Sequence, residues 1–169
     1  MARTSSVAPR VEGLAPVLAP DIRLLVLGSL PGDASLRAAQ YYAHPRNAFW
    51  RLTGQALGED LEALAYEARL GRLKARRIGL WDVIVSAERS GSLDAAIRSP
   101  EAADLRGLVA TLPDLRAVAF NGGLAARLGR RILADQADLM LLDLPSSSPA
   151  HARPLAEKAA RWAALSDFV

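Results

Sequence analysis

The sequence predicts an α/β domain in which helices cover both faces of a central, mostly parallel four-stranded sheet. Four short apolar runs are spread along the chain, and each is continuous rather than alternating between apolar and polar residues. Continuous runs are typical of strands that are buried on both faces. Helical patterns separate the runs, in the order strand, helix, helix, strand, helix, strand, helix, strand, helix. This order indicates a three-layer α/β/α sandwich built by right-handed crossovers.

The individual elements follow from these patterns. Strands are expected at the four apolar runs, which are residues 23–28, 78–85, 116–122 and 138–145. Helices are expected at residues 47–57, 60–70, 100–111, 121–134 and 154–165, and the last begins after a proline. Residues 1–20 are rich in proline and are expected to form an extended N-terminal segment, followed by a single domain over residues 21–169.

Composition excludes several kinds of chemistry. The 169 residues contain no cysteine, which removes disulfides, thiol catalysis, Cys-ligated zinc and iron–sulfur clusters, and two histidines are too few for a convincing His-based metal site. We therefore expect no metal or other cofactor. The N-terminus lacks the apolar core of a signal peptide, and no stretch is apolar enough to span a bilayer. The expectation is a cytoplasmic monomer that does not bind membranes.

The charge balance says little by itself. Lys and Arg number 21 against 18 Asp and Glu, which gives a net charge of +3, and all the basic residues except Lys74 and Lys158 are arginine. Arginine binds phosphate in a bidentate manner, so a nucleic-acid partner is compatible with the composition. A net charge of +3 is too small to indicate a nucleic-acid-binding surface, however, and codon usage is an equally good explanation for the number of arginines.

The ends of the predicted strands are the expected place for a site, because ligands of open α/β sheets bind outside the carboxyl ends of the strands. The four strands are followed by "GSLPGD", "WDVIVSAERSGS", "FNGG" and "LPSSSPAHAR". Residues that form turns account for part of this composition. They do not account for the polar and aromatic residues that follow the first strand, or for three serines between two prolines after the last strand. These stretches therefore indicate a functional site.

Five stretches of the sequence together carry a family resemblance. "GSLPG", "YYAHPRNAFW", "WDV" with "ERSGSLDAAIR", "FNG" and "LPSSSPA" occur in that order over residues 20–155. The chain thereby resembles the uracil-DNA glycosylase superfamily, most closely its hypoxanthine-DNA (deoxyinosine) glycosylase branch, which is related to the mismatch-specific uracil and thymine glycosylases. The superfamily fold is a four-stranded parallel sheet between helices, in agreement with the pattern above.

The resemblance implies a monofunctional DNA glycosylase of base excision repair. Its partner would be DNA that contains a deaminated base, hypoxanthine or uracil, and its product an abasic site, with no cofactor required. The alternative is a non-catalytic or weakly active binder of damaged or abasic DNA. That alternative stays open because Leu30 and Leu144 occupy the two positions at which relatives carry a polar catalytic group.

Two residues are candidates for the group that positions the attacking water. The resemblance to the hypoxanthine branch implicates Asn47, whose side-chain carbonyl can align water although it cannot act as a true base. Asp33 is the second candidate, since it is ionisable and lies three positions after Leu30. Each has a structural alternative: Asn47 could cap the following helix, and Asp33 could be a turn or cap residue.

Base recognition is expected from residues after the first two strands. The backbone N–H groups of Gly28 and Ser29 could meet base carbonyls, and Asp82 could accept a hydrogen bond from a ring N–H of hypoxanthine or uracil. Asp82 could instead orient another group or pair with Arg89.

The resemblance also assigns the shape of the pocket. Uracil-selective relatives carry a tyrosine at the position of Gly32, so glycine implies an open pocket that admits a purine, although a turn with positive φ is an alternative reason for a glycine. Phe49 is expected to stack on the flipped base, and Tyr42 is expected to wall the pocket.

The last motif resembles a loop that enters the minor groove of DNA. Its hydroxyl and backbone N–H groups could bind phosphates, and its prolines would stiffen it. The large side chain that relatives insert into the DNA is not obvious here. The expected DNA contacts are Ser146, Ser147, Ser148, Pro149, His151 and Arg153.

Overall fold

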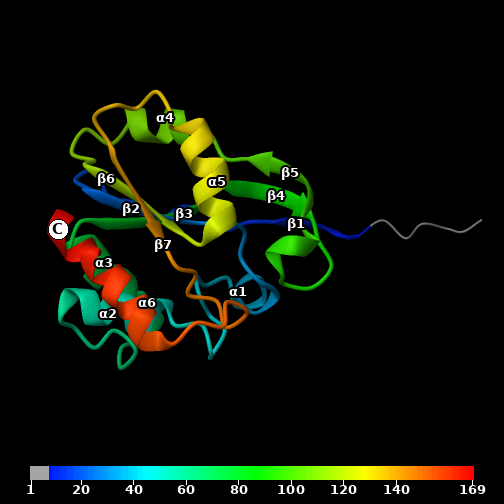
Figure 1. The fold of residues 1–169 in the computed structure, drawn as a ribbon, viewed down its shortest axis with the longest axis horizontal. Helices are drawn as coiled ribbons and strands as arrows, with labels where there is room; N and C mark the ends of the chain where they lie inside the picture. The colour runs from blue at the N-terminus through cyan, green and yellow to red at the C-terminus, as the bar shows by residue number, and fades with distance from the viewer. Residues whose placement is uncertain (1–7) are drawn as a thin grey trace, which may run out of the picture.

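A computed structural model describes residues 8–169 and contains the predicted four-stranded parallel sheet (Figure 1). The strands are β2 (Leu24–Gly28), β3 (Ile78–Asp82), β6 (Ala117–Asn121) and β7 (Met140–Leu144), in the spatial order β3-β2-β6-β7. All three pairings are parallel, so the four carboxyl ends meet at one edge of the sheet. The α/β fold class predicted from the sequence is confirmed.

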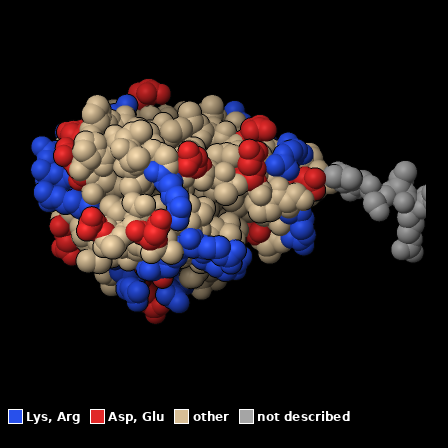
Figure 2. All heavy atoms as spheres, turned by 90° about the horizontal axis from the view of Figure 1, so that it is seen from above, with Lys and Arg blue, Asp and Glu red and all other residues tan. Residues whose placement is uncertain are grey.

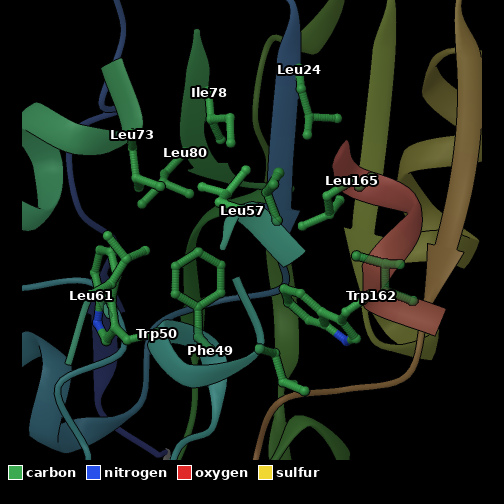
Figure 3. Close-up of a cluster of buried hydrophobic side chains, with 14 of the residues drawn as sticks. Leu24, Phe49, Trp50, Leu57, Leu61, Leu73, Ile78, Leu80, Trp162 and Leu165 are labelled. Carbon is green, nitrogen blue, oxygen red and sulfur yellow. The ribbon is translucent and has the colours of Figure 1, made fainter. Parts of the chain in front are cut away.

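Helices cover both faces of this sheet, which explains why its strands are continuous apolar runs. On one face lie α2 (Phe49–Leu57), α3 (Tyr66–Ala75) and α6 (Leu155–Trp162), and on the other α4 (Leu105–Ala110) and α5 (Gly123–Ile132) (Figure 1). Side chains of β2 alternate between the two cores: Leu24 and Val26 face the first, while Leu25 and Leu27 face the second. Figure 3 shows the first core, where the helices bring Phe49 and other aromatic side chains against the sheet.

A second, smaller sheet was not predicted. The expected strand at 78–85 continues past β3 into β4 (Ile84–Glu88), which pairs antiparallel with β1 (Arg10–Glu12) and β5 (Arg98–Ala102). The expected helix at 100–111 is therefore wrong in its first part, because β5 precedes the short helix α4. All five residues of β5 are exposed, and it contains a proline, as edge strands do. Without a buried face, β5 leaves no periodic apolar pattern in the sequence.

The remaining helices differ from expectation mainly at their ends. The helix expected at 60–70 is α3 instead, because a turn in which the Asp60 carboxylate accepts from the Ala63 N–H precedes it. The helix expected at 154–165 is α6 followed by a 3₁₀ turn, η2 (Ala163–Phe168). A short helix, α1 (Asp33–Ala38), lies within the segment that follows β2 and was not predicted.

The described part of the N-terminal segment packs on the domain. Besides β1, Val17 exchanges two backbone hydrogen bonds with Leu80 of β3, at 2.8 and 2.9 Å. Residues 10–17 thus add to both sheets, whereas the rest of the expected segment, residues 1–7, lies outside the described residues. Within residues 8–169, no helix is long and apolar enough to cross a bilayer.

Surface charges are mixed in sign on the face above α4 and α5. Figure 2 shows basic and acidic side chains interspersed there, with no broad field of one sign. Exposed pairs such as Arg106 with Asp135, and Arg130 with Asp143, account for part of this pattern. This face therefore offers no broad positive surface for a phosphate backbone.

Candidate active site

A cavity of about 600 Å³ lies at the carboxyl ends of the parallel strands. Each strand contributes to its lining: Gly28 ends β2, Asp82 ends β3, Asn121 ends β6, and Ser146 follows β7. The volume falls within the range of small-ligand sites. The structure thus brings together residues that are more than 100 positions apart in the sequence, because parallel strands place their carboxyl ends side by side.

The floor of the cavity depends on the absence of a side chain at Gly28. Gly28 pairs in register with Asp82, and a Cβ at position 28 would lie 2.5 Å from Asp82 Oδ1 and 3.1 Å from the Tyr42 hydroxyl. Any other residue would displace one of these groups. The Gly28 carbonyl accepts from the Val83 N–H at 2.9 Å, so the trans peptide directs the Ser29 N–H away from β3.

Asp82 is a buried carboxyl group with unused hydrogen-bonding capacity. It is 4% exposed, it lines the cavity, and its Oδ2 has no hydrogen-bond partner within the described residues. Burial raises the pKa of Asp82 to about 7, the negative charge of Asp94 adds to this, and the Arg89 guanidinium opposes it. An unpaired buried carboxyl is costly, so its retention in a cavity indicates a functional group.

Arg89 does not pair with Asp82, although the sequence allowed that interpretation. Its guanidinium is buried and donates to the backbone carbonyls of Leu30 and Pro31, at 3.4 and 2.5 Å. It therefore holds the segment after β2 in place and lies behind the cavity lining. Burial lowers the pKa of Arg89, against the nearby charges of Asp33, Asp94 and Asp82.

Asn47 both lines the cavity and orders the start of α2. Its Oδ1 accepts from the Phe49 N–H at 3.0 Å, an Asx turn just before the first helical residue. An amide oxygen has a second lone pair, and the Asn47 side chain borders the cavity. The two roles that the sequence left as alternatives are therefore compatible, because the turn fixes the side chain that faces the cavity.

Asp33 is the first residue of α1 and also lines the cavity, but its carboxylate is exposed. Its backbone N–H donates to the Ser92 hydroxyl at 2.9 Å. The observed contact thus comes from the main chain, which leaves the side chain free to meet solvent or a ligand.

Tyr42, and not Phe49, presents its ring to the cavity. Phe49 is fully buried and does not line the cavity, because it begins α2 and points into the core (Figure 3). Its ring supports that of Tyr42 from behind, with centroids 3.9 Å apart and an interplanar angle of 14°. The expectation that Phe49 stacks directly on a base is corrected: its place is behind the ring that does line the cavity.

The conformation of Tyr42 is unusual for a non-glycine residue. Its φ is +54°, in the left-handed region, and its hydroxyl is buried without a hydrogen-bond partner in the described part of the chain. Burial and the Asp82 carboxylate raise the pKa of Tyr42, against a weaker opposing effect of the Asn121 side chain, so the group stays a neutral phenol. Strained backbone and an unpaired polar atom in one residue are typical of functional sites.

The space next to Gly32 is not open. A Cβ at this position would lie 3.3 Å from the Ser92 hydroxyl, and the φ of Gly32 is −72°, so positive φ is not the reason for a glycine either. Glycine instead lets the segment that carries Ser92 approach the cavity. The expectation of an open pocket at Gly32 is corrected, because a residue 60 positions later occupies the space.

Asp94 also lines the cavity, although no sequence motif identified it as a candidate. It begins a 3₁₀ turn, η1 (Asp94–Ala96), and its Oδ1 accepts from the Ser29 hydroxyl at 2.6 Å. The only signal in the sequence was its position in "ERSGSLDAAIR", a segment without strand or helix periodicity. Within residues 8–169, no cluster of three or more His, Asp or Glu side chains is arranged to hold a metal ion.

The loop after β7 is fixed mainly by Ser147. Its N–H donates to Asn121 Oδ1 and its hydroxyl accepts from Asn121 Nδ2, both at 2.9 Å, while its carbonyl accepts from the Ala48 N–H at 3.0 Å. Ser147 is 1% exposed. The expectation that its hydroxyl binds a DNA phosphate is therefore corrected, because the hydroxyl is buried and bonded to Asn121, where it joins the loop to β6.

The other loop residues remain available to a ligand to different degrees. The Ser146 hydroxyl accepts from the Ser148 N–H, and the Ser148 hydroxyl from the Ala150 N–H, so both also shape the loop. Pro149 is exposed at the cavity rim.

His151 lines the cavity, and burial together with the charges of Lys158 and Arg153 lowers its pKa. Arg153 is exposed, lies outside the cavity lining and forms an ion pair of 3.8 Å with Glu157.

Asn121→Ala is expected to lower the free energy of unfolding by roughly 1–3 kcal/mol, because it leaves the buried N–H and hydroxyl of Ser147 without their partner. Urea unfolding measures the change. Ser148→Ala is the matched control: it removes a loop hydroxyl whose hydrogen bond is exposed and should change stability by less than about 0.5 kcal/mol. Equal effects of the two variants would show that the Asn121–Ser147 hydrogen bonds contribute no more to stability than the exposed hydrogen bond of Ser148.

Comparisons with known proteins give a family match over most of the chain. Residues 15–168 match the family model described as the uracil DNA glycosylase superfamily. A protein named hypoxanthine DNA glycosylase from Methanosarcina acetivorans is 42% identical over 154 residues, which cover 91% of this chain and 96% of that protein. A protein of the same name from Methanosarcina barkeri is 40% identical, with 90% and 95% covered.

A solved structure is similar as well. The solution NMR structure of a Methanosarcina acetivorans protein, described as a candidate uracil DNA glycosylase, superposes with a TM-score of 0.83 at 41% sequence identity. The match covers 93% of this chain and 96% of that one. The fold is therefore shared over nearly the whole chain.

Proposed function

Since the chain belongs to the uracil DNA glycosylase superfamily and is therefore a DNA glycosylase, we propose that the base it removes is deaminated, hypoxanthine first and uracil second. The relatives named hypoxanthine DNA glycosylase support this order. The observation that carries the proposal is the buried carboxyl of Asp82, a residue that lines a cavity of about 600 Å³ and whose Oδ2 has no hydrogen-bond partner among residues 8–169.

The chemistry of Asp82 fits deaminated bases. An ionised carboxylate only accepts hydrogen bonds, and hypoxanthine and uracil both present a ring N–H beside a carbonyl. Adenine and cytosine, from which they arise, present an unprotonated ring nitrogen at that position. This nitrogen and the Asp82 carboxylate would then be two hydrogen-bond acceptors facing each other. Guanine and thymine also carry a ring N–H, but in matched pairs they resist extrusion from the helix more than a mispaired base does.

The other lining groups complete the proposed recognition. The base stacks on the Tyr42 ring, which Phe49 supports from behind. The Ser29 N–H, which points away from β3, serves as a donor to a base carbonyl. A stack of two rings at 3.9 Å is a rigid platform, so little side-chain entropy is lost when the base binds.

Hydrolysis needs a water held on the far side of the sugar from the base. The Asn47 carbonyl oxygen, fixed by the Phe49 N–H, aligns this water with its remaining lone pair. Water adds to C1′, the base departs with the electron pair of the glycosidic bond, and the water proton passes to the base or to solvent. Asp33 is the second candidate for the same task, because its carboxylate borders the cavity and is ionisable.

The proposed product is an abasic site in an uncut strand. A strand-cutting lyase step requires an amine that attacks C1′. Lys158 is buried on α6 and its Nζ donates to the Ser148 carbonyl at 3.3 Å, so it braces the loop and does not line the cavity. The enzyme is accordingly monofunctional.

Oligonucleotides with one hypoxanthine, uracil or mismatched thymine, in duplex and single-stranded form, test this function. Alkali converts abasic sites to strand breaks, and we expect breaks at hypoxanthine faster than at uracil, none without alkali, and no covalent trapping by borohydride. Binding to these oligonucleotides without any break would contradict the proposal and support the alternative of a non-catalytic damage binder. Breaks without alkali would contradict the monofunctional mechanism alone.

A further inference from the structure

The segment between β4 and β5 lies over the cavity and is fixed there at two points. Ser92 accepts a hydrogen bond from the Asp33 N–H at 2.9 Å, and Asp94 accepts one from the Ser29 hydroxyl at 2.6 Å. Both partners belong to the chain that follows β2, about 60 positions earlier. Glycine at position 32 permits the close approach of Ser92. The residue between the two fixed points is Leu93, so its backbone is held although its side chain is not.

Leu93 projects an apolar side chain into solvent at the mouth of the cavity. It is 59% exposed and is part of the cavity lining. In residues 8–169 it is one of two large hydrophobic side chains with this degree of exposure, and the other, Met140 on β7, does not border the cavity. A single exposed leucine is ordinary on a protein surface. A leucine whose neighbours hold it at the entrance of a binding cavity, however, indicates a role in ligand binding.

The opposite rim of the cavity offers no comparable group. The loop after β7 contributes Pro149 and Ala150 at its exposed tip, and Ser147 is locked inside. Neither tip residue reaches far from the backbone. A side chain that separates base pairs must be long and apolar, as the wedges of other DNA-bending and base-flipping proteins are.

We propose that Leu93 enters the base stack of duplex DNA and fills the space that the extruded nucleotide leaves. This inference rests on the proposed function, because it assumes that the cavity receives a base. Extrusion leaves two neighbouring base pairs without stacking contacts, and an apolar side chain replaces part of them. Leu93 is placed for this role because it stands at the cavity mouth, where the base would enter.

Arg98 supports the same role from behind. Its guanidinium donates to the carbonyls of Ala95 and Ile97, at 2.8 and 2.9 Å, and so braces the turn that follows Leu93. Arg98 is exposed and forms no ion pair in the described part of the chain. It therefore stiffens the wedge segment and also leaves a cation near the DNA backbone.

Leu93→Ala is the test, with excision of hypoxanthine from duplex and from single-stranded DNA compared. Loss of the wedge should lower the duplex rate roughly 10- to 50-fold, because only the duplex has a stack to refill, and the single-strand rate should stay within about twofold. Leu93→Phe should restore the duplex rate. Met140→Ala is the matched control, since it removes the other exposed hydrophobic side chain far from the cavity, and both rates should remain unchanged.

A binding measurement separates this inference from the proposed function. A duplex with an uncleavable abasic analogue and a neighbouring 2-aminopurine reports unstacking by fluorescence, whether or not the protein excises any base. The wild-type protein should raise the fluorescence more than Leu93→Ala does at saturation. Equal fluorescence for both proteins, or an equal fall of the duplex and single-strand rates in Leu93→Ala, would overturn the wedge. Absence of excision by the wild-type protein would instead overturn the proposed function.

Discussion

Asn47→Ala should lower the rate of base excision by roughly 100- to 1,000-fold, the cost of removing one well-positioned polar group from an active site. The loss should fall on the chemical step, because in our proposal Asn47 meets the water and not the base. Single-turnover excision at saturating protein measures it, and gel-shift binding to an uncleavable abasic analogue should remain close to that of the wild-type protein.

A loss of protein stability must be distinguished from this loss of excision rate. The same substitution removes the acceptor of the Phe49 N–H, which should cost about 1 kcal/mol as the loss of a helix-terminal cap does. Asn47→Asp is the matched variant, since a carboxylate oxygen can accept from both the Phe49 N–H and a water. It should keep the stability and a larger part of the rate. Full activity of Asn47→Ala at low temperature would show that Asn47 serves only to cap the helix. Loss of activity in Asp33→Ala, with Asn47→Ala still active, would show that Asp33 positions the water.

Asp82→Asn should remove most of the pH dependence of stability between about pH 4 and pH 7. Burial and the charge of Asp94 raise the pKa of Asp82 to about 7 in the folded protein, from an ordinary value of 3.8 in the unfolded chain. Between these values the folded protein holds one more proton than the unfolded chain, so its stability falls as the pH rises. A shift of this size corresponds to about 4 kcal/mol.

Urea unfolding at pH 5 and pH 8 measures this effect. The wild-type protein should lose stability on going to pH 8, and Asp82→Asn should lose much less, because an amide does not titrate. The pKa of Glu59 is lowered to about 2 by its hydrogen bonds and ion pairs with Arg72 and Arg76, so it changes charge below this interval. Parallel stability profiles for the two proteins would show that Asp82 is ionised throughout.

The same residue should set the pH profile of excision. If Asp82 accepts the ring N–H of hypoxanthine, the ionised form is the active one, and kcat/KM should rise as the pH passes through about 7. In Asp82→Asn this rise should disappear. A rate that falls over the same range would mean that a protonated Asp82 donates to a base carbonyl instead, and the recognition proposed above would be reversed.

The sequence by itself determined the central sheet and the edge at which the cavity forms. Continuous apolar runs identify strands buried on both faces, and parallel strands place their carboxyl ends together, so Gly28, Asp82 and Asn121 had to lie near one another. Local sequence also indicated that Asn47 orders the start of a helix, because the turn that it forms spans only two residues.

Tertiary structure alone decided which side chains face the cavity. Which of Tyr42 and Phe49 presents its ring depends on a left-handed backbone at one and a helix start at the other, and no apolar pattern encodes that choice. The role of Gly32 depends on Ser92, whose hydroxyl accepts a hydrogen bond from the Asp33 N–H, 59 positions earlier in the sequence. The same hydrogen bond holds the neighbouring Leu93 at the cavity mouth. Periodicity reports on burial within one element, whereas these placements depend on contacts between loops that only the folded chain brings together.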